Sequence, residues 1–205
     1  MTRSEVAVER KNQIVKATVD CISKYGYNNF SMQDVARIAG VSKGIIHYYF
    51  LNKDDLMMSV LEHVADDISS LLTVGMNEEA DPIKKLEILI STCLNVVRKT
   101  KEFYQVNMDF WTQINQKGEV RHTVAKYYRN FRETCSKVLV EGAEKGVFCK
   151  VNPVEFSSLI IAMVDGISLQ WLFDENAFDY DHTIEQVKTM VLSCLLKTKV
   201  VAAMP

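Results

Sequence analysis

The chain has 205 residues, of which 48% are hydrophobic, and its formal net charge is −2. This hydrophobic content is ordinary for a globular protein and excludes wholesale disorder. With only 8 Gly and 3 Pro, the sequence has few of the residues that end helices and form tight turns. We therefore predict an all-α fold.

Positive charge gathers at the N-terminal end of the chain. Residues 1–53 hold eight Lys or Arg against four Asp or Glu, whereas residues 54–205 hold 16 against 22. This asymmetry is typical of a nucleic-acid-binding head on an acidic body. The N-terminus lacks the apolar core of a signal peptide, and no long uncharged apolar run follows. We expect a cytoplasmic protein with no membrane span.

The cysteines are scattered and contain no CxxC pair, which argues against a disulfide framework and for a reducing compartment. We expect them to be small core residues. They are Cys21, Cys93, Cys135, Cys149 and Cys194.

Three helices are predicted in the first fifty residues. Apolar residues recur at spacings of three and four over residues 14–25, which predicts an amphipathic helix. Ser31 with Asp34 three positions later forms a capping pattern that begins a second helix. Ser42 can cap a third helix that runs through Tyr49.

The turn between the second and third helices predicts a helix-turn-helix. It consists of Ala-Gly-Val at residues 39–41, where Gly40 permits a tight turn. The third helix is unusual for a core helix because it carries Lys43, His47 and Tyr48 on or near its exposed side. Cations and hydroxyls placed in this way are suited to phosphate and base-edge contacts.

Residues 10–60 resemble the DNA-binding domain of the TetR family of regulators. The matching positions are Gly26, Phe30, Ser31, Val35, Ala36, Ala39, Gly40, Val41, Ser42, Lys43, Gly44, Tyr48, Phe50, Lys53 and Leu56. The family often has Tyr at the position of His47 and His at the position of Tyr49.

The resemblance implies a role for each DNA-contacting residue. Lys43 and Gly44 would read bases. The remaining candidate contacts, most of which would hold the DNA backbone, are Ser31, Gln33, Ser42, His47, Tyr48, Tyr49 and Lys53.

The resemblance also implies a homodimeric repressor with a pseudo-palindromic operator and a small-molecule effector. Residues 1–52 would form the DNA-binding domain, and residues 53–205 the ligand-sensing and dimerisation domain. The segments FWTQINQ and VDGISLQWLF resemble the regulatory domain of the choline-responsive branch of this family. No enzymatic activity, cofactor or metal is expected.

The body is predicted to continue as a series of helices, each marked by a cap or an apolar stripe. Three of the expected helices begin near Lys53, at Pro82 and at Pro153. The other three are expected over residues 102–115, about 120–145 and about 182–200.

Two apolar stripes in the last two helices predict the dimer interface. One consists of Val164, Ser168 and Leu172, and we expect it to lack a partner within the chain. The stripe of the final helix is expected to be exposed in the same way, and a four-helix contact about a two-fold axis would cover both. It consists of Ile184, Val187, Val191 and Leu195.

An aromatic cluster in the middle of the body predicts an effector pocket, because aromatic walls with a few polar groups commonly line such sites. Asp165 is the one charge in a long apolar stretch, so it meets a ligand, a partner residue or solvent. The candidate lining residues are Asn107, Trp111, Tyr127, Phe131, Met163, Asp165 and Trp171.

Two other classes of protein remain as alternatives. A di-iron carboxylate enzyme would use Glu-x-x-His pairs such as Glu119 with His122, but Asp179 with His182 is a poor second copy. A helical lipid carrier would explain the apolar body and not the first fifty residues.

Overall fold

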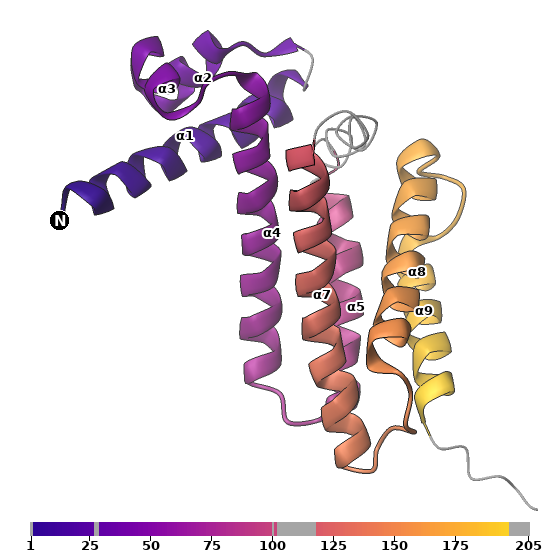
Figure 1. The fold of residues 1–205 in the computed structure, drawn as a ribbon. Coiled ribbons are helices and arrows are strands. Elements are labelled where there is room, and N and C mark those ends of the chain that lie inside the picture. The colour runs from indigo at the N-terminus through magenta and orange to yellow at the C-terminus, as the bar shows by residue number, and fades with distance from the viewer. Residues whose placement is uncertain (1, 27–28, 100, 102–117, 197–205) are drawn as a thin grey trace, which may run out of the picture. The chain divides into compact units, whose positions relative to one another are not determined.

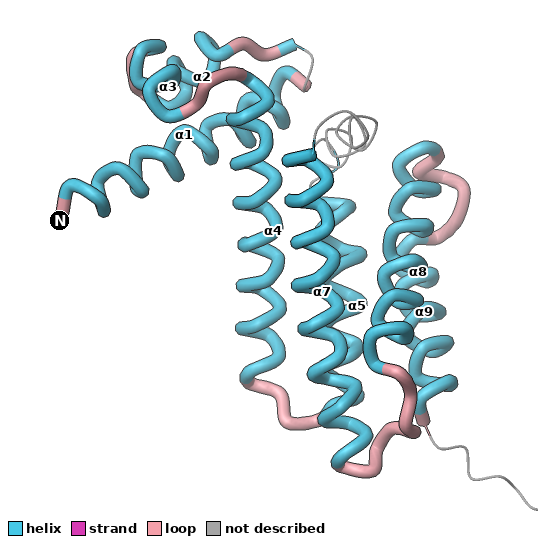
Figure 2. Tube along the Cα trace, in the orientation of Figure 1, coloured by secondary structure: helices cyan, strands magenta, loops and turns pink. Residues whose placement is uncertain are grey.

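The computed structural model describes residues 2–26, 29–99, 101 and 118–196. These residues form eight helices, and their one extended pairing is an isolated bridge between Phe148 and Leu196 (Figures 1 and 2). The all-α prediction is confirmed. The chain divides into two compact units, one of residues 1–67 and 100–125 and one of residues 68–99 and 126–205.

The N-terminal unit is built on α1 (Arg3–Tyr25). The helix begins at Arg3 rather than near residue 14, because the side chain of Thr2 accepts a hydrogen bond from the amide of Glu5, and the Glu5 carboxylate accepts one from the amide of Thr2. This is the same capping pattern that marks the second helix. The first turns of α1 carry no apolar stripe, so the periodicity predicted only the part of the helix from residue 14 onward.

The predicted caps of the helix-turn-helix are confirmed. α2 (Met32–Ala39) begins after Ser31, whose hydroxyl oxygen accepts a hydrogen bond from the amide of Asp34. Gly40 ends the helix with φ +64°, a left-handed conformation that costs glycine little. α3 (Lys43–Tyr49) begins after Ser42, whose hydroxyl oxygen accepts from the amide of Ile45.

The core of this unit holds α3 in place through two fully buried side chains, Ile46 and Phe50. They pack in a cluster formed by α1, α2 and the first turns of α4 (Lys53–Asn77). A helix as short as α3 is not stable by itself in water. Its position therefore depends on this packing, in which Leu56 and Val60 of α4 take part.

The second unit contains α5 (Pro82–Lys99), most of α7 (Gly118–Glu144), α8 (Pro153–Phe173) and α9 (Tyr180–Leu195) (Figure 1). Polar contacts tie these helices together in pairs. The Lys85 ammonium lies 2.7 Å from the Glu141 carboxylate, which joins α5 to α7. The Tyr180 hydroxyl donates to the carbonyl oxygen of Leu94 at 2.8 Å, which joins α9 to α5.

The predicted body helices are confirmed where the structure describes them, with two differences in their bounds. α7 begins at Gly118 and α9 ends at Leu195, whereas the sequence predicted limits near residues 120 and 200. The predicted helix over 102–115 lies outside the described residues.

The predicted dimer stripes are wrong. Val164 and Ser168 of α8 are buried within the single chain, and so are all four stripe residues of α9. Only Leu172 is partly exposed. The apolar side of each helix packs inside its own unit, because that side meets α5 and the neighbouring helix first.

A different face of α8 and α9 carries exposed apolar side chains. Leu159 is 61% exposed and Phe173 is 76% exposed on α8, and Met190 is 57% exposed on α9. By length and composition α8 is apolar enough to cross a membrane, and only 28% of its most apolar window is buried within one chain. Composition alone does not distinguish a membrane span from a helix that another protein surface covers.

Gly142 of α7 is required by the packing of one aromatic ring. A Cβ at this position would lie 2.0 Å from the ring of the fully buried Phe148. We expect Gly142→Ala to destabilise the protein by about 1–3 kcal/mol, because overpacking outweighs the roughly 1 kcal/mol that alanine gains in helix propensity. Denaturant unfolding measures this change.

The double variant Gly142→Ala, Phe148→Leu is the control for that prediction. The smaller side chain leaves room for the new methyl group, so the double variant should lose less stability than the sum of the two single variants. A stabilised Gly142→Ala protein would contradict the packing argument.

Candidate functional site

α3 presents one buried and one exposed side. Ile46 is fully buried, whereas Lys43, Gly44 and His47 are exposed and Tyr48 is 80% exposed. Tyr49 is half-buried, and the centre of its ring lies 5.1 Å from that of Tyr48. An ammonium, an imidazole and a phenol hydroxyl thus face solvent on one short helix. These groups are able to donate to phosphate oxygens and base edges.

Ser31, Ser42 and Gln33 differ in whether a side-chain hydrogen-bond donor remains available for DNA. Ser31 uses both its amide and its hydroxyl hydrogen toward the carboxylate of Asp34, at 2.9 Å and 2.6 Å. The Ser42 hydroxyl acts as an acceptor in its cap, so its hydrogen stays available. Gln33 is exposed in the first turn of α2. A phosphate contact is therefore less costly for Ser42 and Gln33 than for Ser31.

Lys53 lies in the first turn of α4, as predicted, and folds back over the α1–α2 connection. Its ammonium donates to the carbonyl oxygen of Phe30 at 3.2 Å and lies 4.0 Å from the centre of the Phe30 ring. Burial lowers the pKa of Lys53, which the charge of Asp54 partly offsets. A lysine has three N–H donors, so this geometry is compatible with a further contact.

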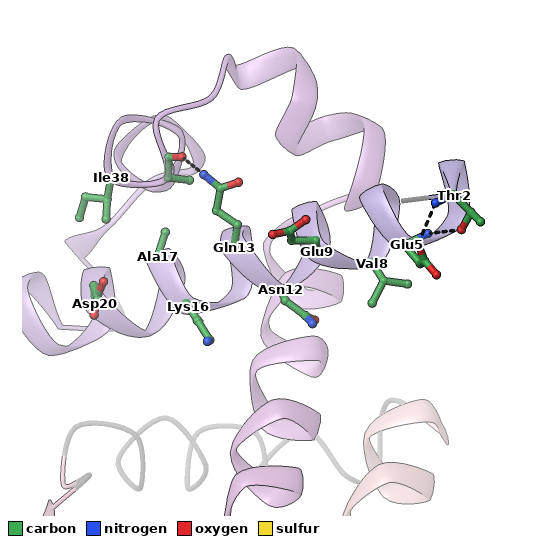
Figure 3. A pocket seen from close by; sticks show the side chains of 11 residues that line it. Thr2, Glu5, Val8, Glu9, Asn12, Gln13, Lys16, Ala17, Asp20 and Ile38 are labelled. Carbon is green, nitrogen blue, oxygen red and sulfur yellow. Dashed lines mark hydrogen bonds between the residues drawn. The ribbon is translucent and has the colours of Figure 1, made fainter.

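A groove lined mainly by α1, with two residues of α2, carries more negative than positive charge (Figure 3). The side-chain amide of Gln13 crosses it to donate to the carbonyl oxygen of Ala39 at 2.7 Å. Three carboxylates and one ammonium line the groove, so it does not attract phosphate. The lining residues are Thr2, Glu5, Val8, Glu9, Asn12, Gln13, Lys16, Ala17, Asp20, Ile38 and Ala39.

In the second unit, Asp165 meets a partner residue, which is one of the three outcomes left open by the sequence, and its side chain is half-buried. The Tyr128 hydroxyl of α7 donates to the Asp165 carboxylate of α8 at 2.8 Å. Burial raises the pKa of Asp165, and this hydrogen bond lowers it in part. Burial also raises the pKa of Tyr128, and the nearby carboxylate raises it further. No lysine or arginine of the described chain forms an ion pair with Asp165.

Two buried thiols lie in the same part of the unit. Burial raises the pKa of Cys93, and the charges of Cys135 and Asp165 raise it further. Burial raises the pKa of Cys135 to about 11, although a hydrogen bond with Ser157 lowers it in part. Both thiols therefore stay protonated at neutral pH. The Asp165 carboxylate is a full charge in this part of the unit, and the charge of Arg132 on α7 also acts on Tyr128, whose pKa it lowers in part.

The prediction that the cysteines are core residues is only partly right. Cys21, Cys93 and Cys135 are buried, whereas Cys149 is half-buried and Cys194 is exposed, and all five are free thiols. Cys194 lies on the side of α9 that faces away from the core, which its helical position and not its residue type decides.

The predicted pocket residues do not all face the same place. Phe131 is buried on the inner side of α7. The centre of the Trp171 ring lies 5.0 Å from the centre of the Tyr180 ring. Met163 lies two positions before Asp165, so the two side chains point to opposite flanks of α8. Tyr127 is half-buried beside Tyr128. Asn107 and Trp111 lie outside the described residues.

Tyr128 is the residue that the predicted pocket set left out. It lies seven positions before Cys135, on the same side of α7 as the buried Phe131 and Cys135. That heptad relation is present in the sequence, but it indicates only that Tyr128 faces inward. The partner of its hydroxyl depends on α8 lying alongside.

Comparisons with known proteins match both parts of the chain. Residues 14–60 match the family of bacterial regulatory proteins called tetR, and residues 82–196 match the C-terminal domain of BetI-type transcriptional repressors. The chain belongs to the TetR family of transcriptional regulators. Its C-terminal domain is of the BetI type.

Individual relatives are distant but span most of the chain. The fatty acid metabolism regulator of Bacillus subtilis is 23% identical over 82% of this chain and 86% of its own length. The regulator BetI of Paraburkholderia xenovorans is 24% identical over 83% of this chain and 85% of its own. A candidate regulator from Saccharomonospora viridis, solved in complex with choline, has the same fold, with a TM-score of 0.80, 21% identity and coverage of 93% of this chain and 99% of its own.

The function predicted from the sequence is thereby confirmed at the level of the family. The chain is a DNA-binding transcriptional repressor that responds to a small molecule, and the comparisons support this function over a lipid carrier or a di-iron enzyme. The Asp179–His182 pair, which was one of the two candidate iron-binding pairs, has a structural role: the Asp179 carboxylate caps α9 by accepting a hydrogen bond from the backbone amide of His182.

Proposed function

We propose that this chain is a dimeric cytoplasmic repressor that leaves its pseudo-palindromic operator when a small organic cation binds in the second unit. The observation that carries the proposal is the half-buried Asp165 carboxylate, which has a tyrosine hydroxyl as its described hydrogen-bond partner. Operator binding and effector binding are the whole activity in this proposal, without catalysis or a cofactor.

DNA binding is assigned to the exposed side of α3 and to the residues that flank it. Lys43 and Gly44 meet base edges in the major groove, and His47, Tyr48 and Tyr49 meet the backbone. The outward direction of Lys43, Gly44, His47 and Tyr48 supports this assignment. The flanking backbone contacts are Ser31, Gln33, Ser42 and Lys53.

The division into a DNA-binding domain of residues 1–52 and a sensing domain of residues 53–205 follows the same functions. α4 begins at Lys53 and also supplies Leu56 and Val60 to the core of the N-terminal unit. A movement of α4 would therefore reach the residues that support α3. We propose this helix as the link between effector binding and operator release.

A second copy of the chain covers the exposed apolar face of α8 and α9 in this proposal. Leu159, Gly166 and Phe173 recur at helical spacing on the outer side of α8, and a Cβ at Gly166 would meet open space. Met190 adds an apolar side chain on α9. An apolar face of this kind suits an isologous contact, in which the same surface is used by both subunits.

The proposed effector is a cation because of the charge balance around Asp165. An ionised carboxylate in a desolvated position is costly unless a positive charge or several donors compensate it. Tyr128 supplies one donor and, with Tyr127, aromatic surface that attracts cations. The choline complex of the structural relative agrees with this class of ligand.

A fatty acid derivative is the effector class that a role in fatty acid metabolism, named for the Bacillus subtilis relative, would suggest, but it has no matching feature at Asp165. An anionic head group would face a carboxylate there, and like charges at close range repel.

The first prediction concerns DNA recognition. Lys43→Ala should weaken operator binding by about 1–3 kcal/mol and relax the preference at one base position. Lys53→Ala should weaken binding to all DNA sequences alike. It should also make the slope of log affinity against log salt concentration shallower by roughly the amount that one phosphate contact contributes. Lys16→Ala, in the acidic groove, is the control and should bind as the wild type does. Unchanged affinity and preference in Lys43→Ala would overturn the assignment of α3.

The second prediction concerns assembly. Leu159→Arg should split the dimer, because a charge replaces an apolar side chain within the proposed contact, and operator binding should fall with it. Val140→Arg is the control, since Val140 is an exposed apolar residue on α7, away from this face. Sedimentation of both variants measures the outcome. A wild-type chain that sediments as a monomer at micromolar concentration would contradict the proposed dimer.

The third prediction concerns the effector. Choline chloride should release the full-length repressor from its operator more strongly than sodium chloride at the same ionic strength. Asp165→Asn should bind the operator and lose this response, and its melting temperature at neutral pH should equal or exceed that of the wild type, because the amide buries no charge. Glu133→Gln, on the exposed side of α7, should respond normally.

The pH dependence of release follows from the raised pKa of Asp165. The cation binds the ionised carboxylate, so the choline concentration for half-release should rise as the pH is lowered toward that pKa. Fluorescence polarisation of a labelled operator measures both effects. Release by a long-chain acyl thioester, with no choline response, would refute the cation proposal and leave operator binding intact.

A further inference from the structure

One exposed side chain of α3 is apolar, and none of the contacts assigned above uses it. Ile45 is 37% exposed and lies in the first turn of the helix. The neighbouring Gly44 has no side chain to cover it. An apolar group next to Lys43 and Tyr48 on the proposed DNA-facing surface would gain from contact with an apolar group of the DNA, which the charged phosphates do not offer.

The position of Ile45 is well defined before any DNA binds. Its amide donates to the Ser42 hydroxyl oxygen at 3.3 Å, and the next residue, Ile46, is fully buried. The backbone is therefore held on both sides. The side chain branches at Cβ, which restricts its rotamers and lowers the entropy that ordering it would cost.

The major groove offers one apolar group, the C5-methyl of thymine. Residues in the first turns of a recognition helix are those that reach base edges. We infer that Ile45 contacts a thymine methyl in each half-site and so selects an A·T pair at that position. This inference rests on the proposed placement of α3 in the major groove.

The methyl group can be removed from the DNA without changing any hydrogen bond. Once the preferred operator has been selected with the wild-type protein, each thymine is replaced by deoxyuridine, one symmetric pair at a time. Loss of one buried methyl should weaken binding roughly fourfold in one half-site and about 15-fold in both. This loss should appear at one symmetric thymine pair.

Protein variants test whether Ile45 is the partner of that methyl. Ile45→Ala should bind the thymine and deoxyuridine operators equally, and Ile45→Val should keep most of the difference. Ile38→Ala is the matched control, because Ile38 is 36% exposed but lines the groove beside α1. It should discriminate as the wild type does. Melting temperatures of all variants show whether they are folded.

The outcomes separate this inference from the broader function. Tight operator binding with no thymine sensitive to demethylation overturns the Ile45 contact alone, and so does a difference that persists in Ile45→Ala. Failure of the wild-type protein to select any DNA sequence overturns the contact together with the DNA-binding role.

Discussion

The burial of Ile46 and Phe50 is the contact on which the proposed DNA-facing surface of α3 depends. α3 is too short to form by itself, so its orientation comes from these two anchors in the core of the N-terminal unit. Because Ile46 points inward, Gly44, Ile45 and Tyr48 are turned toward solvent. The order of residues within one helical turn thus decides which side chains are available to DNA.

The second unit obeys a different constraint. Its helices are packed by apolar side chains, yet Asp165 is kept in a desolvated position with Tyr128 as its described partner. An interior selected for packing alone would gain by replacing such a carboxylate with an uncharged side chain. A charge that costs stability there is consistent with a role in ligand binding, since functional sites keep groups that the fold does not need.

Features set by neighbours in the chain were predictable. The Ser31 and Ser42 caps, the turn at Gly40 and the start of α8 at Pro153 each depend on residues within four positions of one another. Features set by distant segments were not. The stripe from Ile184 to Leu195 marks the apolar side of α9, but an apolar stripe does not say whether its partner is α5 or a second subunit.

By itself, the sequence determined the helical class, the caps, the helix-turn-helix and the family, because each is written in short-range spacing or in residues at fixed positions. The tertiary structure decided that Tyr128 meets Asp165, that Phe148 needs Gly142, and which face of α8 stays exposed. The first of these contacts joins two helices that are far apart in the chain, and the second depends on how the segment after α7 folds back onto that helix. Helical periodicity gives the direction of each side chain around its own axis, and only the packing of the helices supplies what that side chain meets.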